Sequence, residues 1–594
     1  MASKEPAPHS VPILPVSDVA EEREQKAQRA ARRDFIDSRI AELQEEIRKW
    51  RSDRNELSPI SRLPPEVLSR VFIHHQQHRT SSHVKAFNWT KVAHVSRYWR
   101  DTALGCPELW SNITTSNSHW AQAMFERSKQ APISLSFWAY WDTKPQLAEM
   151  IKSAFSQPHR LKDLKITGHN DFVHQRLEEL SPSTPILRSL VLECGPGYGQ
   201  SRIPDNLLGG QAPMLRELHW TGYRFSWSTI SSISSSLTSL KLSNPMPRTS
   251  DNAPSPEAFF GGFQSMKNLR ELDLDLNLPI HPLSTFLIIP LPQLESLTIR
   301  GSFRECGTVM KHFALPPALS AKFYIFNSPD DTEGDVMAFG NSISSSWLAG
   351  PLSNSSYGSS CRLECISVNS DLYRAIIEAN NAPEMMELVD RTRDHPTLYL
   401  KLDKNKFLPD LLAALPLNDV LTLNLKSSCT SHELMPLSCL PSIHTIYAER
   451  YAAEDLVFYA KADPALDMTT PDSTSESRSG SLTRFASVKR LVFESADFEG
   501  IDMDVFLDWL MMRYELGGEI ESLELNGCVR LYGEDVDRIE EVVVDVDWDG
   551  DEIECYSDEE DDEDDGDYHD GCGMPGCVNC YGVDSDFVDY LTYF

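Results

Sequence analysis

The sequence predicts an α/β protein in three parts: an N-terminal helix with a small all-α unit, a solenoid of parallel strands plus helices, and a disordered acidic tail. Three observations predict this order. The 594 residues are 41% hydrophobic, which is enough for several domains or one long array. A short template of alternating apolar residues recurs from residue 161 onward, as expected for strands. From residue 534 the composition becomes strongly acidic.

The N-terminal segment predicts one long helix. Residues 1–20 are rich in proline and polar side chains and are expected to be disordered. In residues 21–57, apolar residues follow at alternating four- and three-residue steps: Ile36, Ile40, Leu43, Ile47, Trp50 and, after Arg54, Leu57. About three heptads are the lower limit for a coiled coil. The helix is therefore expected either to pack on the neighbouring domain or to mediate self-association.

Residues 58–113 predict a small helical domain. The Pro64-Pro65 pair suits the first turn of a helix, where a missing N–H costs nothing, and Glu66 suits the positive end of the helix dipole. Apolar residues then follow at helical spacing: Val67, Leu68, Val71 and Phe72. A second helix carries Val95, Trp99 and Arg100, and a Leu109-Trp110 pair closes the segment.

These three ordered motifs resemble an F-box, whose pattern is Leu-Pro-x-Glu-hydrophobic-Leu, then Val-x-x-x-Trp-Arg, then Leu-Trp. Ser96 stands where the family usually has Cys, and a polar insert from His74 to Ser82 replaces a short link. The resemblance implies docking on the Skp-type adaptor of a cullin-based SCF ubiquitin ligase. The implied docking or supporting residues are Leu63, Pro64, Glu66, Val67, Leu68, Val71, Phe72, Val95, Trp99, Leu109 and Trp110.

Residues 114–533 predict an irregular array that resembles leucine-rich repeats. Six copies of Leu-x-x-Leu-x-apolar begin at Leu161, Leu187, Leu215, Leu237, Leu269 and Leu294. Weaker copies begin at Leu363, Leu398, Leu421, Ile443, Val488 and Ile520, and Cys528 follows the last. Each copy predicts one strand that stacks in parallel on its neighbour, with helices between copies. Polar stretches near 326–360 and 464–485 are expected to be loops.

Residues 534–594 predict a low-complexity tail. Its acidic block, Asp558 to Asp565, repels itself and is not expected to fold. A weak candidate zinc site comprises His569, Cys572, Cys577 and Cys580, with free thiols as the alternative. Because this candidate is weak, we predict no metal or other cofactor.

Composition and missing motifs argue against several classes of function. A net charge of −33 disfavours nucleic-acid binding. No run of about eighteen apolar residues predicts a membrane span, and scattered cysteines indicate reduced thiols, so a cytoplasmic or nuclear location is expected. Gly-x-Ser-x-Gly, a phosphate loop and His-Glu-x-x-His are absent, and we predict no enzyme.

The resemblance implies that the two domains have separate functions. The F-box would bind the adaptor, and the repeats would bind a protein substrate for ubiquitination. The chain would then be the substrate-recognition subunit of an SCF-type ligase, with the adaptor and cullin as partners. The alternative is an F-box-bearing interaction scaffold that acts outside a ligase. The charge of the tail alone would also suit an acidic-tailed chaperone.

Overall fold

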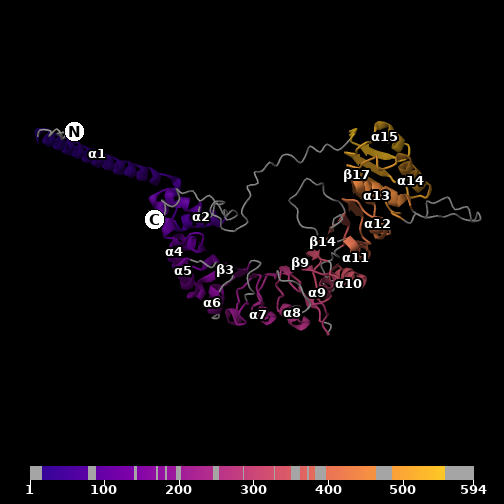
Figure 1. The fold of residues 1–594 in the computed structure, drawn as a ribbon, viewed down its shortest axis with the longest axis horizontal. Coiled ribbons are helices and arrows are strands. Elements are labelled where there is room, and N and C mark those ends of the chain that lie inside the picture. The colour runs from indigo at the N-terminus through magenta and orange to yellow at the C-terminus, as the bar shows by residue number, and fades with distance from the viewer. Residues whose placement is uncertain are drawn as a thin grey trace, which may run out of the picture. The chain divides into compact units, whose positions relative to one another are not determined.

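A computed structural model describes residues 16–77, 88–139, 144–168, 171–180, 184–194, 202–244, 253–284, 287–326, 328–348, 362–370, 374–380, 397–403, 405–462 and 484–554. The chain forms two compact units (Figure 1). Unit 1 comprises Met1–Gly301 with Lys311–Leu319, and unit 2 comprises Ser302–Met310 with Ser320–Phe594. The fold is mixed α/β, as predicted, with N-terminal helices followed by strands that alternate with helices.

Unit 1 begins with helices. The 41-residue helix α1 (Val16–Glu56) is continuous, and its apolar stripe is exposed along its length. Of the two alternatives expected for this stripe, packing on the neighbouring domain is not seen among the described residues. The small helical domain follows with η1 (Pro59–Arg62), α2 (Pro65–Gln77), η3 (Asn88–His94), α3 (Arg97–Leu104) and η4 (Pro107–Trp110). Residues 78–87, which hold the rest of the polar insert, lie outside the described residues.

Eight strands of unit 1 pair in parallel and in chain order. They are β1 (Asn112–Thr114), β2 (Ile133–Ala139), β3 (Leu161–Gly168), β4 (Ser189–Glu193), β5 (Glu217–Thr221), β6 (Ser239–Ser243), β7 (Glu271–Asp275) and β9 (Ser296–Gly301). The template residues meet in register: Leu164 lies beside Leu190, and Leu190 beside Leu218. All are buried, so the predicted stack of apolar residues forms the core.

Helices separate the strands of unit 1 and cover the core. They are α4 (Ser118–Arg127), α5 (Pro145–Phe155), η5 (Pro158–Arg160), α6 (Asp171–Glu179), η6 (Leu207–Gly210), α7 (Trp227–Ile233) and α8 (Pro256–Phe263). A separate short parallel pair joins β8 (Ile289–Pro290) to β10 (Phe313–Ala314). Aromatic contacts fill the layer between helices and sheet. Between ring centroids, Phe137 on β2 lies 6.2 Å from Phe155 on α5.

Unit 2 departs from chain order. Its strands are β11 (Ser320–Ile325), β12 (Cys365–Ser370), β13 (Ala375–Asn380), β14 (Leu398–Leu402), β15 (Thr422–Leu425), β16 (Thr445–Glu449), β17 (Arg490–Glu494), β18 (Ser522–Asn526) and β19 (Asp545–Trp548). The sheet order is β11-β14-β13-β12-β15 and then β16 to β19. Strand β13 is antiparallel to both β12 and β14, and the other neighbouring pairs are parallel. An alternating pattern sets which face is buried but not which strand lies beside it, so the template could not predict this order.

The helices of unit 2 correct two expectations about boundaries. They are α9 (Phe303–Met310), α10 (Glu333–Ile343), the π-helical turn η8 (Ser344–Leu348), η9 (Asn405–Phe407), α11 (Leu408–Ala414), α12 (Ser431–Ser438), α13 (Tyr451–Lys461), α14 (Met503–Glu515) and α15 (Gly533–Glu540). Helix α10 falls inside the expected loop near 326–360, and a capping box of Thr332 and Asp335 starts it. With α15 and β19, the array continues to Trp548, beyond the boundary expected at residue 533.

Among the described helices, none combines the length and the hydropathy that crossing a lipid bilayer requires. The candidate zinc ligands His569, Cys572, Cys577 and Cys580 lie outside the described residues, as does the acidic block. Within the part of the chain that the structure describes, no cluster of three or more His, Cys, Asp or Glu side chains is arranged to hold a metal ion.

Candidate functional site

The helical domain at residues 59–110 is built around α2 and α3. Helix α2 begins at Pro65, directly after Pro64, and Glu66 occupies its first turn. Ser96 starts α3, because its side-chain oxygen accepts a hydrogen bond from the Trp99 N–H at 3.2 Å. The serine that departs from the family pattern therefore has a structural role as the N-cap of α3.

An aromatic core holds this domain together. The predicted residues Leu68, Phe72, Leu109 and Trp110 are all buried, so they form the interior of the domain. The Trp110 ring lies 5.2 Å from Trp89 and 5.7 Å from Trp120, between ring centroids. Phe72 lies 5.1 Å from Trp99. These contacts fix the positions of α2, η3, α3 and η4 around one cluster.

Side-chain hydrogen bonds fix the backbone around this core. The Trp110 indole N–H donates to the Ala103 carbonyl at 2.8 Å, and the Gln76 amide donates to the Leu109 carbonyl at 3.2 Å. The Tyr98 hydroxyl donates to the Leu63 carbonyl. The first two bonds join separate helical segments, and the third joins α3 to the backbone between η1 and α2, so the domain is a rigid support for the side chains on its surface.

A basic side chain also belongs to this core. The Arg127 guanidinium lies over the Trp110 ring, 4.6 Å from its centroid. Burial lowers the pKa of Arg127 from its ordinary value, and the nearby Glu126 carboxylate partly offsets this. The guanidinium keeps its charge at neutral pH because arginine starts from a very high pKa. Arg127 thus contributes a cation–π contact that ties α4 to η4.

Four aliphatic side chains on the same domain remain in solvent, between 40% and 54% exposed. This exposed set consists of Ile60, Val67, Val71 and Val95. Val67 and Val71 lie one turn apart on α2, and α2 packs against η3, after which Val95 follows. Pro64 and Glu66 are also exposed, while Leu63 and Trp99 are half-buried. A group of exposed apolar side chains on one small domain is a candidate protein-docking surface.

The structure therefore divides the eleven predicted residues into two groups. The core group is Leu68, Phe72, Leu109 and Trp110, and the surface group is Leu63, Pro64, Glu66, Val67, Val71, Val95 and Trp99. Sequence reasoning missed Ile60, although its place ahead of the Leu63-Pro64 motif was a signal. It also missed Trp89 and Trp120 as core anchors. A buried and an exposed apolar residue look alike in a helical pattern, so the pattern alone could not separate the groups.

The strand face of unit 1 offers a second surface, made of side chains that alternate with the buried template residues. Three ion pairs cross between neighbouring strands. They are Lys165 with Glu193 at 2.8 Å, Lys241 with Glu271 at 2.6 Å and Arg300 with Asp273 at 2.6 Å. Trp220, Tyr223 and Trp227 are buried and belong to the core.

One cluster on this strand face contains the residue types of a hydrolytic site but not its geometry. Nε2 of His219 lies 3.1 Å from Oγ of Ser239, whose hydroxyl donates to Glu271 at 2.7 Å. In a catalytic triad the carboxylate orients the histidine, not the serine. Burial and then Lys241 lower the pKa of His219, with the nearby carboxylates raising it, so the imidazole is neutral at pH 7. The cluster is a polar link between strands.

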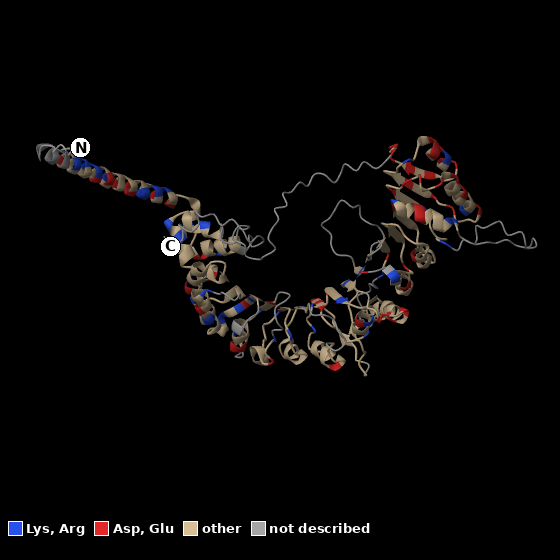
Figure 2. Cartoon of the chain, in the orientation of Figure 1, with Lys and Arg blue, Asp and Glu red and all other residues tan. Residues whose placement is uncertain are grey.

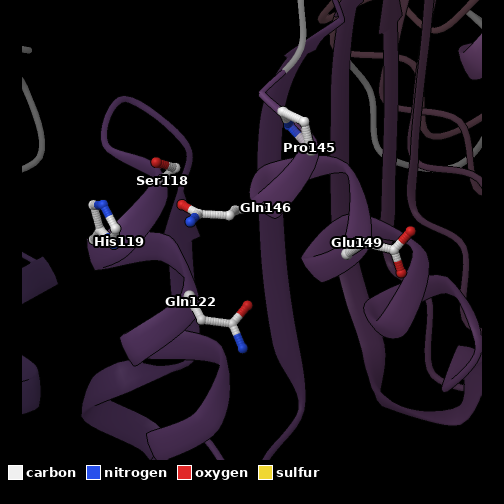
Figure 3. A pocket seen from close by; sticks show the side chains of 6 residues that line it. All are labelled: Ser118, His119, Gln122, Pro145, Gln146 and Glu149. Carbon is white, nitrogen blue, oxygen red and sulfur yellow. The ribbon is translucent and has the colours of Figure 1, made fainter.

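A shallow cavity of about 500 Å³ lies between α4 and α5 (Figure 3). It is lined by Ser118, His119, Gln122, Pro145, Gln146 and Glu149. Gln146 lies between the two helices, whereas His119 and Glu149 point away from one another (Figure 3). One histidine and one carboxylate that do not converge give neither a metal site nor an acid–base pair.

The helical domain, with its buried aromatic core and exposed apolar set, has the features of a protein-interaction module. The comparison with protein families agrees, because the F-box-like family model matches residues 60–116. The chain therefore contains an F-box-like domain, a non-enzymatic interaction module. A search of curated proteins finds no match to this chain.

Proposed function

We propose that this protein is the substrate-recognition subunit of an SCF-type cullin ubiquitin ligase, acting in the cytoplasm or the nucleus. The F-box-like domain would dock on the Skp-type adaptor, and the repeat array would bind a protein substrate. The observation that carries the proposal is the exposed set of Ile60, Val67, Val71 and Val95 on a domain that matches the F-box-like family.

The arrangement suits tethering. The rigid aromatic core holds the exposed set in place, so little order needs to be gained on binding the adaptor. The array presents a long polar strand face on which a substrate could be held. A ligase subunit of this kind supplies proximity only, because holding a substrate beside the reacting enzyme raises its effective concentration.

The direct test compares adaptor binding by the intact chain with binding by a Val67→Glu, Val71→Glu double variant. Both residues are exposed, so the variant should fold, while two carboxylates at an apolar interface should weaken binding by roughly 100-fold or more. Ile288→Glu is the matched control, since it places a carboxylate at an exposed aliphatic residue outside the F-box-like domain. Purified Skp-type adaptor and titration calorimetry give the affinities.

The outcomes separate the proposal from its alternative. Binding that is lost in the double variant, kept in Ile288→Glu and accompanied by cullin in a pull-down supports the ligase subunit. Adaptor binding without cullin would instead indicate the scaffold that acts outside a ligase. Failure of the intact chain to bind the adaptor would refute the ligase subunit and leave the scaffold, with the repeat array as its binding surface.

A further inference from the structure

Helix α1 carries an apolar stripe that nothing in the described structure covers. Its side chains are between 44% and 67% exposed: Ile36, Ile40, Leu43, Ile47 and Trp50. At its end, α1 is joined to η1 by hydrogen bonds to the Asn55 carbonyl from the Ser58 N–H and the Ser61 hydroxyl. A run of five large apolar side chains in water is unfavourable unless a partner covers it.

The spacing of the stripe indicates what kind of partner fits. Steps of four and three residues place Ile40 and Ile47 at heptad position a, and Ile36, Leu43 and Trp50 at position d. This repeat makes a narrow seam, which is the geometry of one helix packed on another. A membrane surface fits poorly, because α1 carries eleven acidic and ten basic side chains instead of a cationic face. Figure 2 shows both signs interspersed along α1.

We propose that α1 pairs with α1 of a second copy of this chain in an antiparallel coiled coil centred between Ala41 and Glu42. In this register Ile40 packs on Leu43 of the second copy, and Ile36 packs on its Ile47. At each end of these layers, Trp50 lies against Arg33 of the second copy, where a guanidinium over an indole ring is favourable.

The charges beside the seam select this orientation. Residues at heptad position g face one another in an antiparallel pair. Arg39 then meets Glu46 of the second copy, and Arg32 meets its Asp53, so each contact joins opposite charges. A parallel pair would instead place Arg33 against Arg33 of the second copy, next to the apolar layers of the seam, where like charges repel.

The antiparallel arrangement also leaves room for the domains that follow. The seam is centred about fifteen residues before the F-box-like domain, and a helix rises about 1.5 Å per residue. The two F-box-like domains would therefore lie at opposite ends of the coiled coil, roughly 45 Å apart. Each could bind its own adaptor without a clash.

The first test measures the mass of the intact chain by light scattering across a concentration series. The chain has a mass of 67.1 kDa, and the proposal expects twice that value. An Ile40→Asp, Leu43→Asp variant should weaken the dimer by roughly 100-fold or more, because it places carboxylates in the seam. Phe35→Asp is the matched control, since Phe35 is 71% exposed and lies at heptad position c, outside the seam. An intact chain that stays monomeric, or a dimer that survives the seam variant, would overturn the proposal.

The second test addresses orientation by charge reversal. In the antiparallel register, Arg39→Glu places two carboxylates together and should weaken the dimer, and adding Glu46→Arg should restore it. A parallel pair predicts a different pattern, because Glu46→Arg would then face Arg51 of the second copy. The ion pair of Arg39 with Glu42 within α1, at 2.7 Å, is lost in both variants, so its loss does not distinguish them. A double variant that remains weak would refute the antiparallel register. Adaptor binding is a separate property, so it can fail or succeed independently of the dimer.

Discussion

At the scale of single residues, burial divides apolar side chains of the F-box-like domain that the sequence cannot tell apart. Val67 and Leu68 are neighbours in α2, yet one is exposed and the other is fully buried. The same distinction applies to Val71 and Phe72. A substitution of an exposed residue should change binding to a partner, and a substitution of a buried residue should change the stability of the domain. Two predictions belong to this scale.

The first concerns the core of the F-box-like domain. Trp110 is 1% exposed and donates a hydrogen bond to Ala103. Trp110→Ala should therefore lower the free energy of unfolding of this domain by about 3–5 kcal/mol. Urea denaturation followed by fluorescence measures the loss. Val67→Glu should leave the same curve within about 0.5 kcal/mol, and a Trp110→Ala curve that matches the intact chain would contradict the assigned core.

The second concerns thiol reactivity. Burial raises the pKa of Cys365 to about 11 and the pKa values of Cys429 and Cys528 to about 12. These thiols stay protonated at neutral pH and are shielded, so they should alkylate slowly. Cys439 is exposed and should alkylate first among the cysteines that the structure describes. Iodoacetamide labelling of the folded chain with peptide mapping measures the order, and early modification of Cys528 would contradict the placement of β18.

At the scale of elements, the strand face of unit 2 carries carboxylates that oppose one another. Figure 2 shows acidic residues gathered on the strands at the C-terminal end of unit 2. Glu449 on β16 lies directly beside Glu494 on β17 in the sheet register. Burial raises the pKa of Glu449, Lys426 partly offsets this, and Glu494 raises it further. The ionised form of Glu449 therefore opposes folding.

A pH-dependent gain in stability follows for Glu449→Gln. A carboxyl with a raised pKa binds its proton more tightly in the folded state, so its penalty is full above the folded pKa and absent below the unfolded pKa near 4. The variant should gain stability at pH 7, by less than about 1 kcal/mol, and the gain should vanish in acid. Thermal melts at several pH values measure it. Glu193→Gln, which removes the ion pair with Lys165, should give no gain at pH 7.

The elements also show how much of the fold the sequence could predict. The repeated template located β3 to β7 and β9, because alternation of apolar residues is a direct consequence of strand geometry. It missed β2, β11, β13 and β19, which lack the full template. It also missed α10, although Thr332 and Asp335 form a recognisable cap. For the F-box-like site, the sequence found the right segment, but only the fold shows which of its side chains reach the surface.

At the scale of the whole molecule, the last repeat should be essential for solubility. Val536, Ile539 and Val543 are buried, and β19 covers the edge of β18. Truncation after residue 533 removes this cover and exposes both an apolar surface and an open strand edge. That chain should aggregate, whereas a chain ending at residue 554 should stay soluble. Size-exclusion chromatography distinguishes them, and a soluble 1–533 chain would contradict the capping role.

The reversed strand order in unit 2 has a consequence for synthesis on the ribosome. Repeats of unit 1 add to the sheet in chain order, so each can fold as it emerges. Strand β11 ends at Ile325, but its parallel neighbour β14 begins only at Leu398. During translation, β12 and β13 are therefore synthesised before β14, which is the strand that joins them to β11. Unit 2 must wait for translation to pass residue 402, and this interval is when the growing chain most needs a chaperone.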